Sequence, residues 1–317
     1  MLNFNFYPQI NMKKVLVTGG SGFIGSHTVD LLLAQGTAVR VLDNLTSGHR
    51  SNLPTEHPLL EFIEGDITNQ KTVDQAMSGV THCLNLAAQV SVVASLEDPE
   101  FSAKQNIIGF INVINAAQNH KIDRLVYASS AAIYGEPSVI PLPENATKTQ
   151  LSPYGLEKQI NEEYANLYKD LYQLSSLGQR YFNVYGPRQD PKSPYAGVIA
   201  LFVDRIKEAK PLTVYGDGLQ TRDFIYAGDV AKANVAALNS NVSGACNIAT
   251  GNQTTLLGLI DTLSDLTGNR CVVTHADPRE GDIRHSLAIT KKMNEELKTV
   301  AKTELKNGLT LLMDSDY

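Results

Sequence analysis

A tyrosine and a lysine stand four residues apart in the segment Tyr154-Gly155-Leu156-Glu157-Lys158. Residues at this spacing lie on one face of a helix, so a helix starting here would bring the phenol and the ammonium together. A phenol is a poor base at neutral pH because its reference pKa is about 10, but a nearby positive charge favours the phenolate. The pair is a candidate for proton transfer, but taken alone this spacing more often marks a surface pair.

Two serines, Ser129 and Ser130, stand at the end of a predicted strand at 124–128. A serine hydroxyl at the end of that predicted strand could bridge a substrate hydroxyl and the tyrosine. This order and spacing select Ser130, Tyr154 and Lys158 as the candidate catalytic residues.

A glycine turn with the spacing G-x-x-G-x-x-G runs from Gly19 to Gly25. Glycines there permit a tight turn and a close approach to a pyrophosphate, which the following helix N-terminus favours. Asp43 ends the next predicted strand, 18 residues after Gly25. A carboxylate there accepts from both ribose hydroxyls and repels a 2′-phosphate, which predicts NAD rather than NADP. A plain glycine loop is the alternative.

Strand and helix patterns that could position these residues alternate through the first part of the chain. Strands are expected at 15–17, 38–42, 61–64, 80–86, 124–128 and 174–181, and helices from 23 onward, at 106–119 and at 154–172. This alternation predicts a parallel sheet covered on both faces, with ligands beyond the carboxyl ends of its strands. Asp66 and Ile67 follow the third strand and would border the adenine, although Asp66 could equally cap a helix from Thr68 onward.

Glycine, proline and tyrosine become frequent after residue 182, which indicates a smaller, loop-rich unit that caps the sheet. We expect residues 12–181, rejoined by about 226–249, to form the NAD-binding domain. Residues 182–225 and 250–317 would form the substrate domain, ending in a helix at 291–305 and a frayed tail.

Composition excludes several classes of protein. The 317 residues are 43% hydrophobic and carry a net charge of −6, which allows a full core and argues against nucleic-acid binding. No apolar run approaches the roughly 18–20 residues of a membrane span. The three cysteines are far apart without metal-ligand spacing, so we expect buried thiols, no metal and a cytoplasmic location. Residues 1–11 do not resemble a signal peptide.

Seven segments together resemble the extended short-chain dehydrogenase/reductase family and, within it, nucleotide-sugar 4-epimerases, especially bacterial UDP-N-acetylglucosamine 4-epimerases. They are TGGSGFIG, LDNLTSG, GDIT, NLAAQ, YASSAAIYGE, SPYGLEK and RYFNVYGPRQ. The resemblance spans roughly residues 13–290. It implies an α/β fold, a Rossmann-like doubly wound parallel sheet with a smaller C-terminal substrate-binding domain. It also implies tightly bound NAD, a UDP-sugar substrate and a homodimer joined through two helices, for which 106–119 and 157–172 are candidates.

The same resemblance implies roles for individual residues. Tyr154 would remove the proton of the sugar 4-hydroxyl with Ser130 as relay, while Lys158 lowers the tyrosine pKa and holds the nicotinamide ribose. The implied NAD contacts are Gly19, Gly22, Phe23, Ile24, Gly25, Asp43, Asn44, Asp66, Ile67, Leu86, Ala87, Ala88, Gln89, Asn106, Ser129, Tyr154, Lys158 and Tyr181. The implied substrate contacts are Ser91, Ser130, Asn183, Val198, Tyr215, Arg222, Arg279, Asp282 and Ser286.

Two positions bear on the choice of reaction and substrate within the family. Alanine follows Ser130 where related dehydratases and decarboxylases carry an acid, which disfavours elimination. Ser286 stands where a tyrosine is typical of enzymes confined to UDP-glucose and UDP-galactose, and a small residue leaves room for an N-acetyl group. It permits that group without requiring it, so a UDP-glucose 4-epimerase is an alternative. A dehydratase or reductase, or a non-catalytic NAD-binding regulator, would use the same fold.

Overall fold

The computed structural model describes residues 13–192, 197–268, 271–278 and 283–315. At its centre lies a seven-stranded sheet of order β11-β6-β5-β4-β1-β2-β3, in which all neighbours are parallel. The strands are β1 (Lys14–Thr18), β2 (Ala38–Asp43), β3 (Leu60–Glu64), β4 (His82–Asn85), β5 (Arg124–Ser130), β6 (Ser176–Tyr181) and β11 (Gly244–Ile248). The chain order reverses between β1 and β4, so the predicted doubly wound sheet is confirmed.

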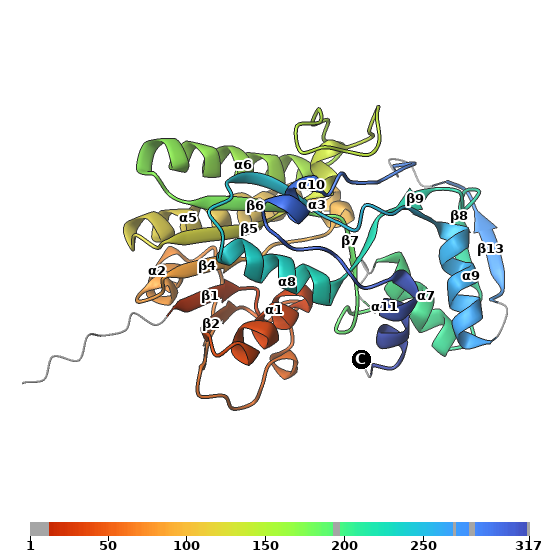
Figure 1. The fold of residues 1–317 in the computed structure, drawn as a ribbon, viewed down its shortest axis with the longest axis horizontal. Helices are drawn as coiled ribbons and strands as arrows, with labels where there is room; N and C mark the ends of the chain where they lie inside the picture. The colour runs from red at the N-terminus through yellow and green to blue at the C-terminus, as the bar shows by residue number, and fades with distance from the viewer. Residues whose placement is uncertain (1–12, 193–196, 269–270, 279–282, 316–317) are drawn as a thin grey trace, which may run out of the picture.

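Helices cover both faces of this sheet (Figure 1). On one face lie α1 (Phe23–Ala34) and α8 (Ala227–Leu238), and on the other lie α2 (Gln70–Met77), α5 (Gly109–Asn119) and α6 (Pro153–Tyr172). Successive side chains of each strand point to opposite faces of the sheet and pack into the hydrophobic core on each face. In β1, Val15 and Val17 pack on the α1 side, whereas Leu16 packs on the opposite side.

The helical segment before β5 is longer than the expected 106–119. After α3 (Val92–Glu97), helix α4 (Pro99–Ala103) begins at a proline behind the capping residue Asp98, whose Oδ1 accepts from Phe101 N at 2.9 Å. A π-helical turn, η2 (Lys104–Ile108), then joins α4 to α5. Two 3-10 turns, η1 (Arg50–Asn52) and η3 (Ala131–Tyr134), follow β2 and β5.

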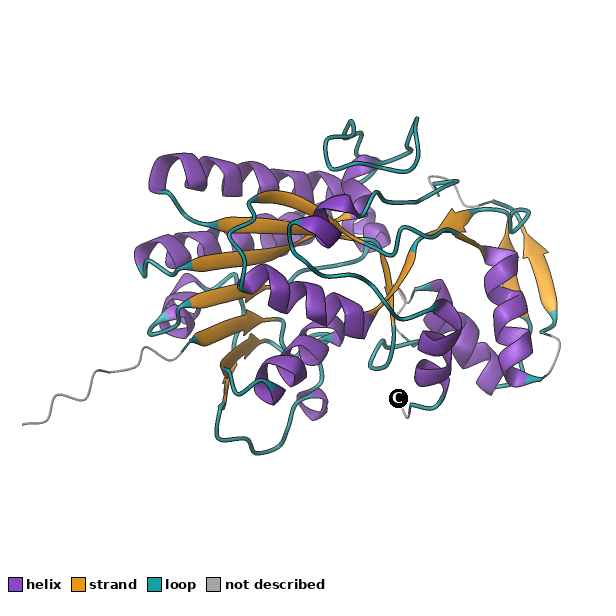
Figure 2. Cartoon of the chain, viewed as in Figure 1, coloured by secondary structure: helices purple, strands orange, loops and turns teal. Residues whose placement is uncertain are grey.

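The second half of the chain builds a smaller unit beside the sheet (Figure 2). Its strands form three pairs: β7 (Asn183–Tyr185) with β10 (Phe224–Tyr226), β8 (Leu212–Tyr215) with β13 (Val273–Ala276), and β9 (Thr221–Arg222) with β12 (Thr254–Thr255). Helices α7 (Val198–Lys207), α9 (Leu256–Thr267) and α11 (Leu305–Met313) complete its own hydrophobic core.

The expected helix at 291–305 is wrong. The segment forms a short α10 (Lys291–Glu295), and a second helix, α11, begins where the expected one was to end. The tail is not frayed at α11, because Leu309 and Leu312 are buried in the core of the smaller unit. Helix α10 instead returns to the sheet, where Met293 packs in the core beneath α1 and α8. None of the described helices combines the length and apolarity needed to cross a membrane.

Candidate active site

The glycine turn lies at the carboxyl end of β1, between that strand and α1. Gly19 has a φ of +69°, and a Cβ there would stand 2.7 Å from Ala87 N. A Cβ on Gly25 would stand 2.1 Å from Gly19 O. The first glycine therefore lets the turn approach the β4 loop, and the last lets α1 pack against the turn. Phe23 and Ile24 form the first turn of α1 behind the capping residue Gly22.

The strand reversal between β1 and β4 is held by a polar bridge. Thr18 Oγ1 donates to Asn85 Oδ1 at 2.6 Å and accepts from Ala87 N at 3.2 Å, while Leu86 N donates to Thr18 O. The bridge sets the segment from Leu86 to Ala88 against the glycine turn. This is the place where an open parallel sheet binds a dinucleotide, so the structure fits NAD. Thr18 and Asn85 were not among the expected site residues, although they begin the motifs TGGSGFIG and NLAAQ.

Asp43 lies buried at the end of β2, where the sequence places the contact to the ribose. Its Oδ2 accepts from Ser21 N at 2.9 Å and its Oδ1 accepts from Leu45 N at 2.8 Å. Each carboxylate oxygen keeps further acceptor capacity. The carboxylate is thus fixed against the glycine turn and can still accept from ribose hydroxyls.

Asp66 belongs to the same edge of the sheet. It accepts from Thr68 N at 2.7 Å and from the Asn44 side-chain amide at 2.9 Å. Burial raises the pKa of Asp66, but these hydrogen bonds outweigh burial and leave it below its usual range. Helix α2 is capped by Asn69, so the alternative in which Asp66 caps it is wrong. The adjacent Ile67 is buried.

The candidate catalytic residues come together at the carboxyl ends of β5 and the start of α6. Ser152 caps α6 by accepting from Gly155 N at 3.1 Å, which places Tyr154 in the first helical turn. The Tyr154 hydroxyl is hydrogen-bonded to Ser130, whose Oγ also accepts from Ala132 N at 3.1 Å. Lys158 Nζ lies over the tyrosine ring, 5.5 Å from its centroid.

Burial dominates the protonation of this pair. It raises the pKa of Tyr154, and the Ser130 hydrogen bond only partly opposes this. Burial also lowers the pKa of Lys158 to about 8. The resemblance implies that Lys158 lowers the pKa of Tyr154, but in this structure burial outweighs any such effect and leaves that pKa raised.

Three predicted cofactor residues use their side chains within the protein. The Ser129 hydroxyl donates its proton to Glu162 Oε1 at 2.7 Å, so it has no proton left to donate to a cofactor. Tyr181 lies in the sheet core with its hydroxyl 2.7 Å from Asn234 Oδ1. The Asn106 amide is bonded to the main chain of Gln89 in both directions, each at 2.9 Å. These side chains hold the site's framework.

The predicted substrate residues are spread over the smaller unit and the β4 loop. Ser91 is buried at the N-terminus of α3, Asn183 is exposed at the start of β7, and Val198 begins α7. Tyr215 ends β8, and Arg222 ends β9 with its Nη1 2.9 Å from Thr221 O. Arg279 and Asp282 lie outside the described residues.

Ser286 is buried between the smaller unit and the loop that follows β5 and η3. Its main-chain N–H donates to Thr221 O at 3.1 Å. The next residue, Leu287, accepts from Leu142 N at 2.7 Å. The segment that carries Ser286 is therefore fixed to the chain beyond Ser130, which sequence spacing alone could not indicate.

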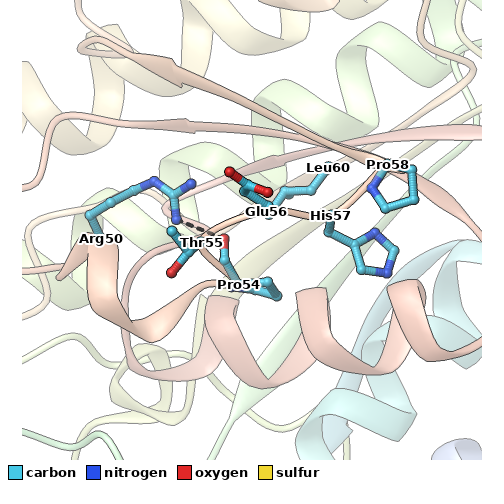
Figure 3. Close-up of a pocket in the computed structure, with 7 residues that line it drawn as sticks. All are labelled: Arg50, Pro54, Thr55, Glu56, His57, Pro58 and Leu60. Atoms are coloured by element: carbon cyan, nitrogen blue, oxygen red, sulfur yellow. Dashed lines mark hydrogen bonds between the residues drawn. The ribbon is translucent and has the colours of Figure 1, made fainter.

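A surface hollow at the β2–β3 connection lies apart from these residues. It is lined by Arg50, Pro54, Thr55, Glu56, His57, Pro58 and Leu60 (Figure 3). The Arg50 guanidinium lies over the Phe62 ring and donates to Pro54 O at 3.1 Å. This surface hollow contains no predicted site residue, and we assign it no ligand.

The fold and the glycine turn define an NAD-binding α/β enzyme. The model of the NAD dependent epimerase/dehydratase family matches residues 15–249, and the chain belongs to that family. Its relatives place it among the NAD-dependent UDP-sugar 4-epimerases, which confirms the resemblance seen in the sequence.

Three similar proteins illustrate this relationship. A protein of Methanocaldococcus jannaschii, named provisionally as a UDP-glucose 4-epimerase, is 42% identical over 93% of this chain and 95% of its own. The UDP-N-acetylglucosamine 4-epimerase of Methanobrevibacter ruminantium, solved with UDP-N-acetylmuramic acid, is 36% identical with a TM-score of 0.92 over 95% of this chain and 97% of that one. The UDP-glucose 4-epimerase of Thermus thermophilus, solved with NAD, is 37% identical with a TM-score of 0.88 over 95% and 98%.

Proposed function

We propose that this enzyme catalyses the reversible C4 epimerisation of a UDP-hexose, with UDP-N-acetylglucosamine and UDP-N-acetylgalactosamine as the preferred pair. The observation that carries the proposal is the hydrogen-bonded Ser130–Tyr154 pair, with Lys158 over the tyrosine ring, at the same sheet edge as the glycine turn. This arrangement suits removal and return of a hydroxyl proton beside a dinucleotide.

The proposed reaction begins at the sugar 4-hydroxyl. The Tyr154 oxygen takes the hydroxyl proton, and Ser130 orients the hydroxyl through its bond to the tyrosine. When bound, NAD supplies a hydride acceptor and donor at C4, so that no external redox partner is needed. The resulting 4-keto sugar turns about its diphosphate tether, and Tyr154 returns the proton to the oxygen of the epimer.

Several residues would hold NAD and set the charge of the site. The turn from Gly19 to Gly25 would take the pyrophosphate, Asp43 the ribose, and the segment from Leu86 to Gln89 the nicotinamide side. Lys158 would hold the nicotinamide ribose with its ammonium, which also favours a phenolate. Burial of the lysine keeps solvent from screening that charge.

The surroundings of Ser130 favour epimerisation over elimination. Ser130 is followed directly by the turn η3, whose first three residues are Ala131, Ala132 and Ile133. Loss of water would require an additional acid and base near the sugar. These hydrocarbon side chains supply neither, so simple oxidation and reduction at one carbon is the better fit.

The substrate preference is argued from Ser286. Its small, buried side chain leaves space that a phenol ring would occupy, and an acetamido group can use that space. The similarity to a UDP-N-acetylglucosamine 4-epimerase supports this choice. The similarity to proteins named as UDP-glucose 4-epimerases supports UDP-glucose and UDP-galactose as the second candidate pair.

We further infer a homodimer, working in the cytoplasm, where its thiols stay reduced. Exposed apolar side chains gather on α3 and α6, with Leu96, Leu156, Leu167 and Leu171 among them. If these side chains form one surface, it would be of the kind that marks interaction sites. The face includes the predicted helix 157–172, and Ile108 of η2 adds to it.

Product analysis tests the proposed function. The purified enzyme is incubated, without added NAD, with UDP-N-acetylglucosamine and separately with UDP-glucose, and the nucleotide sugars are separated by chromatography. Formation of UDP-N-acetylgalactosamine at an equal or higher rate than UDP-galactose supports the proposal. Conversion of UDP-glucose alone would keep the mechanism and reject the substrate preference, and no conversion of either, even with NAD supplied, would reject the function.

A further inference from the structure

Helix α6, which carries Tyr154 and Lys158, also carries a buried carboxylate that takes no part in the proposed proton transfer. Glu157 stands between Tyr154 and Lys158 and is only 3% exposed. Its Oε2 accepts from Ser102 Oγ at 2.8 Å and from Asn106 Nδ2 at 2.6 Å. Its Oε1 is buried without a hydrogen-bond partner among the described residues. Such a group is costly to bury, so its contacts need an explanation.

Asn106 connects this carboxylate to the loop that follows β4. Its Oδ1 accepts from Gln89 N and its Nδ2 donates to Gln89 O, each at 2.9 Å. Asn106 stands in the π-helical turn η2, an irregularity often found at functional sites. One amide therefore joins the helix that carries Tyr154 to the main chain of Gln89.

The same loop is joined to α6 at a second point. The Gln89 side chain is bonded to the main chain of Ser91, and Ser91 Oγ caps α3 by accepting from Ala94 N at 3.0 Å. One turn further along α3, Ser95 Oγ accepts from Tyr154 N at 3.2 Å. The β4–α3 loop is thus joined to α6 at Gln89, through Asn106 and Glu157, and the helix that follows it is joined to α6 at Ser95.

We propose that Glu157 is a positioning residue: by holding Asn106 it fixes the loop of Gln89 and Ser91 relative to Tyr154 and Lys158. The effect on catalysis rests on the proposed function, whereas the effect on the loop does not. Loss of this contact would let the proposed nicotinamide and substrate contacts shift away from the catalytic pair.

The carboxylate also has an electrostatic role. The titratable groups it faces are Tyr154 and Lys158 of its own helix, while α4, η2 and the β4–α3 loop present the Ser102 hydroxyl and the amides of Asn106 and Gln89. Burial raises the pKa of Tyr154, and the negative charge of Glu157 raises it further. Burial lowers the pKa of Lys158, and Glu157 opposes that change.

Two substitutions separate the contact from the charge. Both donors use the single oxygen Oε2, so the amide oxygen of Glu157→Gln can accept both hydrogen bonds while its NH2 group replaces Oε1. Glu157→Gln removes the charge and keeps the contact, whereas Glu157→Ala removes both. Glu163→Ala, on the exposed side of the same helix, is the matched control.

Hydrogen exchange at the amides of residues 86–95 tests the contact without any substrate. We expect exchange at least about tenfold faster in Glu157→Ala, and wild-type exchange in Glu157→Gln and Glu163→Ala, at matched global stability. Equal protection of the loop in Glu157→Ala would overturn the proposal. Because this measurement needs no turnover, it decides the inference even if the wild-type enzyme converts no UDP-sugar.

Kinetics with the converted UDP-sugar test the consequence. In Glu157→Ala we expect kcat to fall about tenfold or more because the reacting groups are misplaced. In Glu157→Gln we expect the acid limb of the kcat profile to move to lower pH, because the pKa of Tyr154 falls when the negative charge is removed. A structural role alone would leave that limb in place, and an unmoved limb would reject the electrostatic part.

Discussion

The ammonium of Lys158 lies over the ring of Tyr154, 5.5 Å from its centroid, while the tyrosine hydroxyl is bonded to Ser130. The two neighbours thus act on different parts of the phenol. Ser130 orients the atom that carries the proton, and Lys158 supplies a buried positive charge at the ring face. This division of roles underlies the proposed chemistry.

Replacing Tyr154 by phenylalanine removes the proposed acid–base group and leaves the ring in place. We expect kcat for epimerisation to fall by about 10³-fold or more, because general acid–base groups contribute on the order of 10²–10⁴. Bound NAD, measured after denaturation of the purified protein, should be unchanged. The control is Tyr172→Phe at the exposed end of the same helix. A Tyr154→Phe enzyme as active as this control would exclude the assigned role.

Replacing Lys158 by methionine should change how stability depends on pH in the NAD-free protein. The folded-state pKa of about 8 lies below the usual 10.5, so the unfolded chain binds more protons between these values. The free energy of unfolding of the wild type therefore increases as the pH rises from 8 to 10.5. At 1.36 kcal/mol per pKa unit this increase is about 3 kcal/mol at most.

The measurement for Lys158→Met is urea unfolding at pH 7.5 and 10.5. The variant should be more stable than the wild type at pH 7.5, with a smaller difference at pH 10.5, and it should be inactive. If the difference between the two proteins did not change with pH, the lysine would not be buried as a charged group.

The ion pair of Arg180 with Glu162 should matter for stability more than its surface counterparts. Arg180 donates Nε and Nη2 to the two carboxylate oxygens, at 2.8 and 2.7 Å, and both side chains are buried. Arg180→Met leaves a buried carboxylate without its main partner, which costs about 3–5 kcal/mol. Lys210→Met breaks an exposed pair with Glu208 and should change the free energy of unfolding far less. Similar unfolding free energies for both variants would contradict this.

Ser286→Tyr should restrict the substrate range. A phenol ring at this buried position would occupy the space proposed for the acetamido group. We expect kcat/KM for UDP-N-acetylglucosamine to fall by about 10²-fold relative to that for UDP-glucose, because exclusion acts only on the larger substrate. Ser286→Ala keeps the space and should preserve the ratio. An unchanged ratio in Ser286→Tyr would place the N-acetyl pocket elsewhere.

The proposed dimer face can be tested by adding charge to it. Leu167 and Leu171 are exposed on α6, so Leu167→Glu with Leu171→Glu should leave the folded chain intact while opposing burial at an interface. Light scattering after size exclusion should then report a monomer. Val272→Glu, at an exposed apolar residue of the smaller unit, should remain dimeric. A wild-type monomer would reject the proposed dimer.

The sheet was predictable because its signals are local. Alternating apolar runs and the glycine spacing located β1, β2 and the turn at Gly19 to within a residue or two. Helix ends that depend on distant contacts were not predictable. The π-helical turn around Asn106 is fixed by Gln89 and Glu157, and α11 forms where Leu309 and Leu312 meet the core of the smaller unit.

Candidate site residues could be named from the sequence, whereas their contacts could not. The motif spacing indicated Ser130, Tyr154 and Lys158, and the structure brings them together. The motif spacing gave no signal that the Tyr181 hydroxyl contacts Asn234 rather than facing open space at the sheet edge. Such directions depend on packing between segments far apart in the chain.

The most direct test of the account follows the hydrogen at C4 of the sugar. The purified enzyme, with no NAD added, is given a UDP-hexose deuterated at C4, and the epimer is examined by mass spectrometry and NMR. Internal oxidation and reduction predicts an epimer that keeps deuterium at C4 and its full complement of hydroxyl groups. Loss of the label to solvent, or a product lacking a hydroxyl group, would contradict C4 epimerisation through hydride transfer to bound NAD.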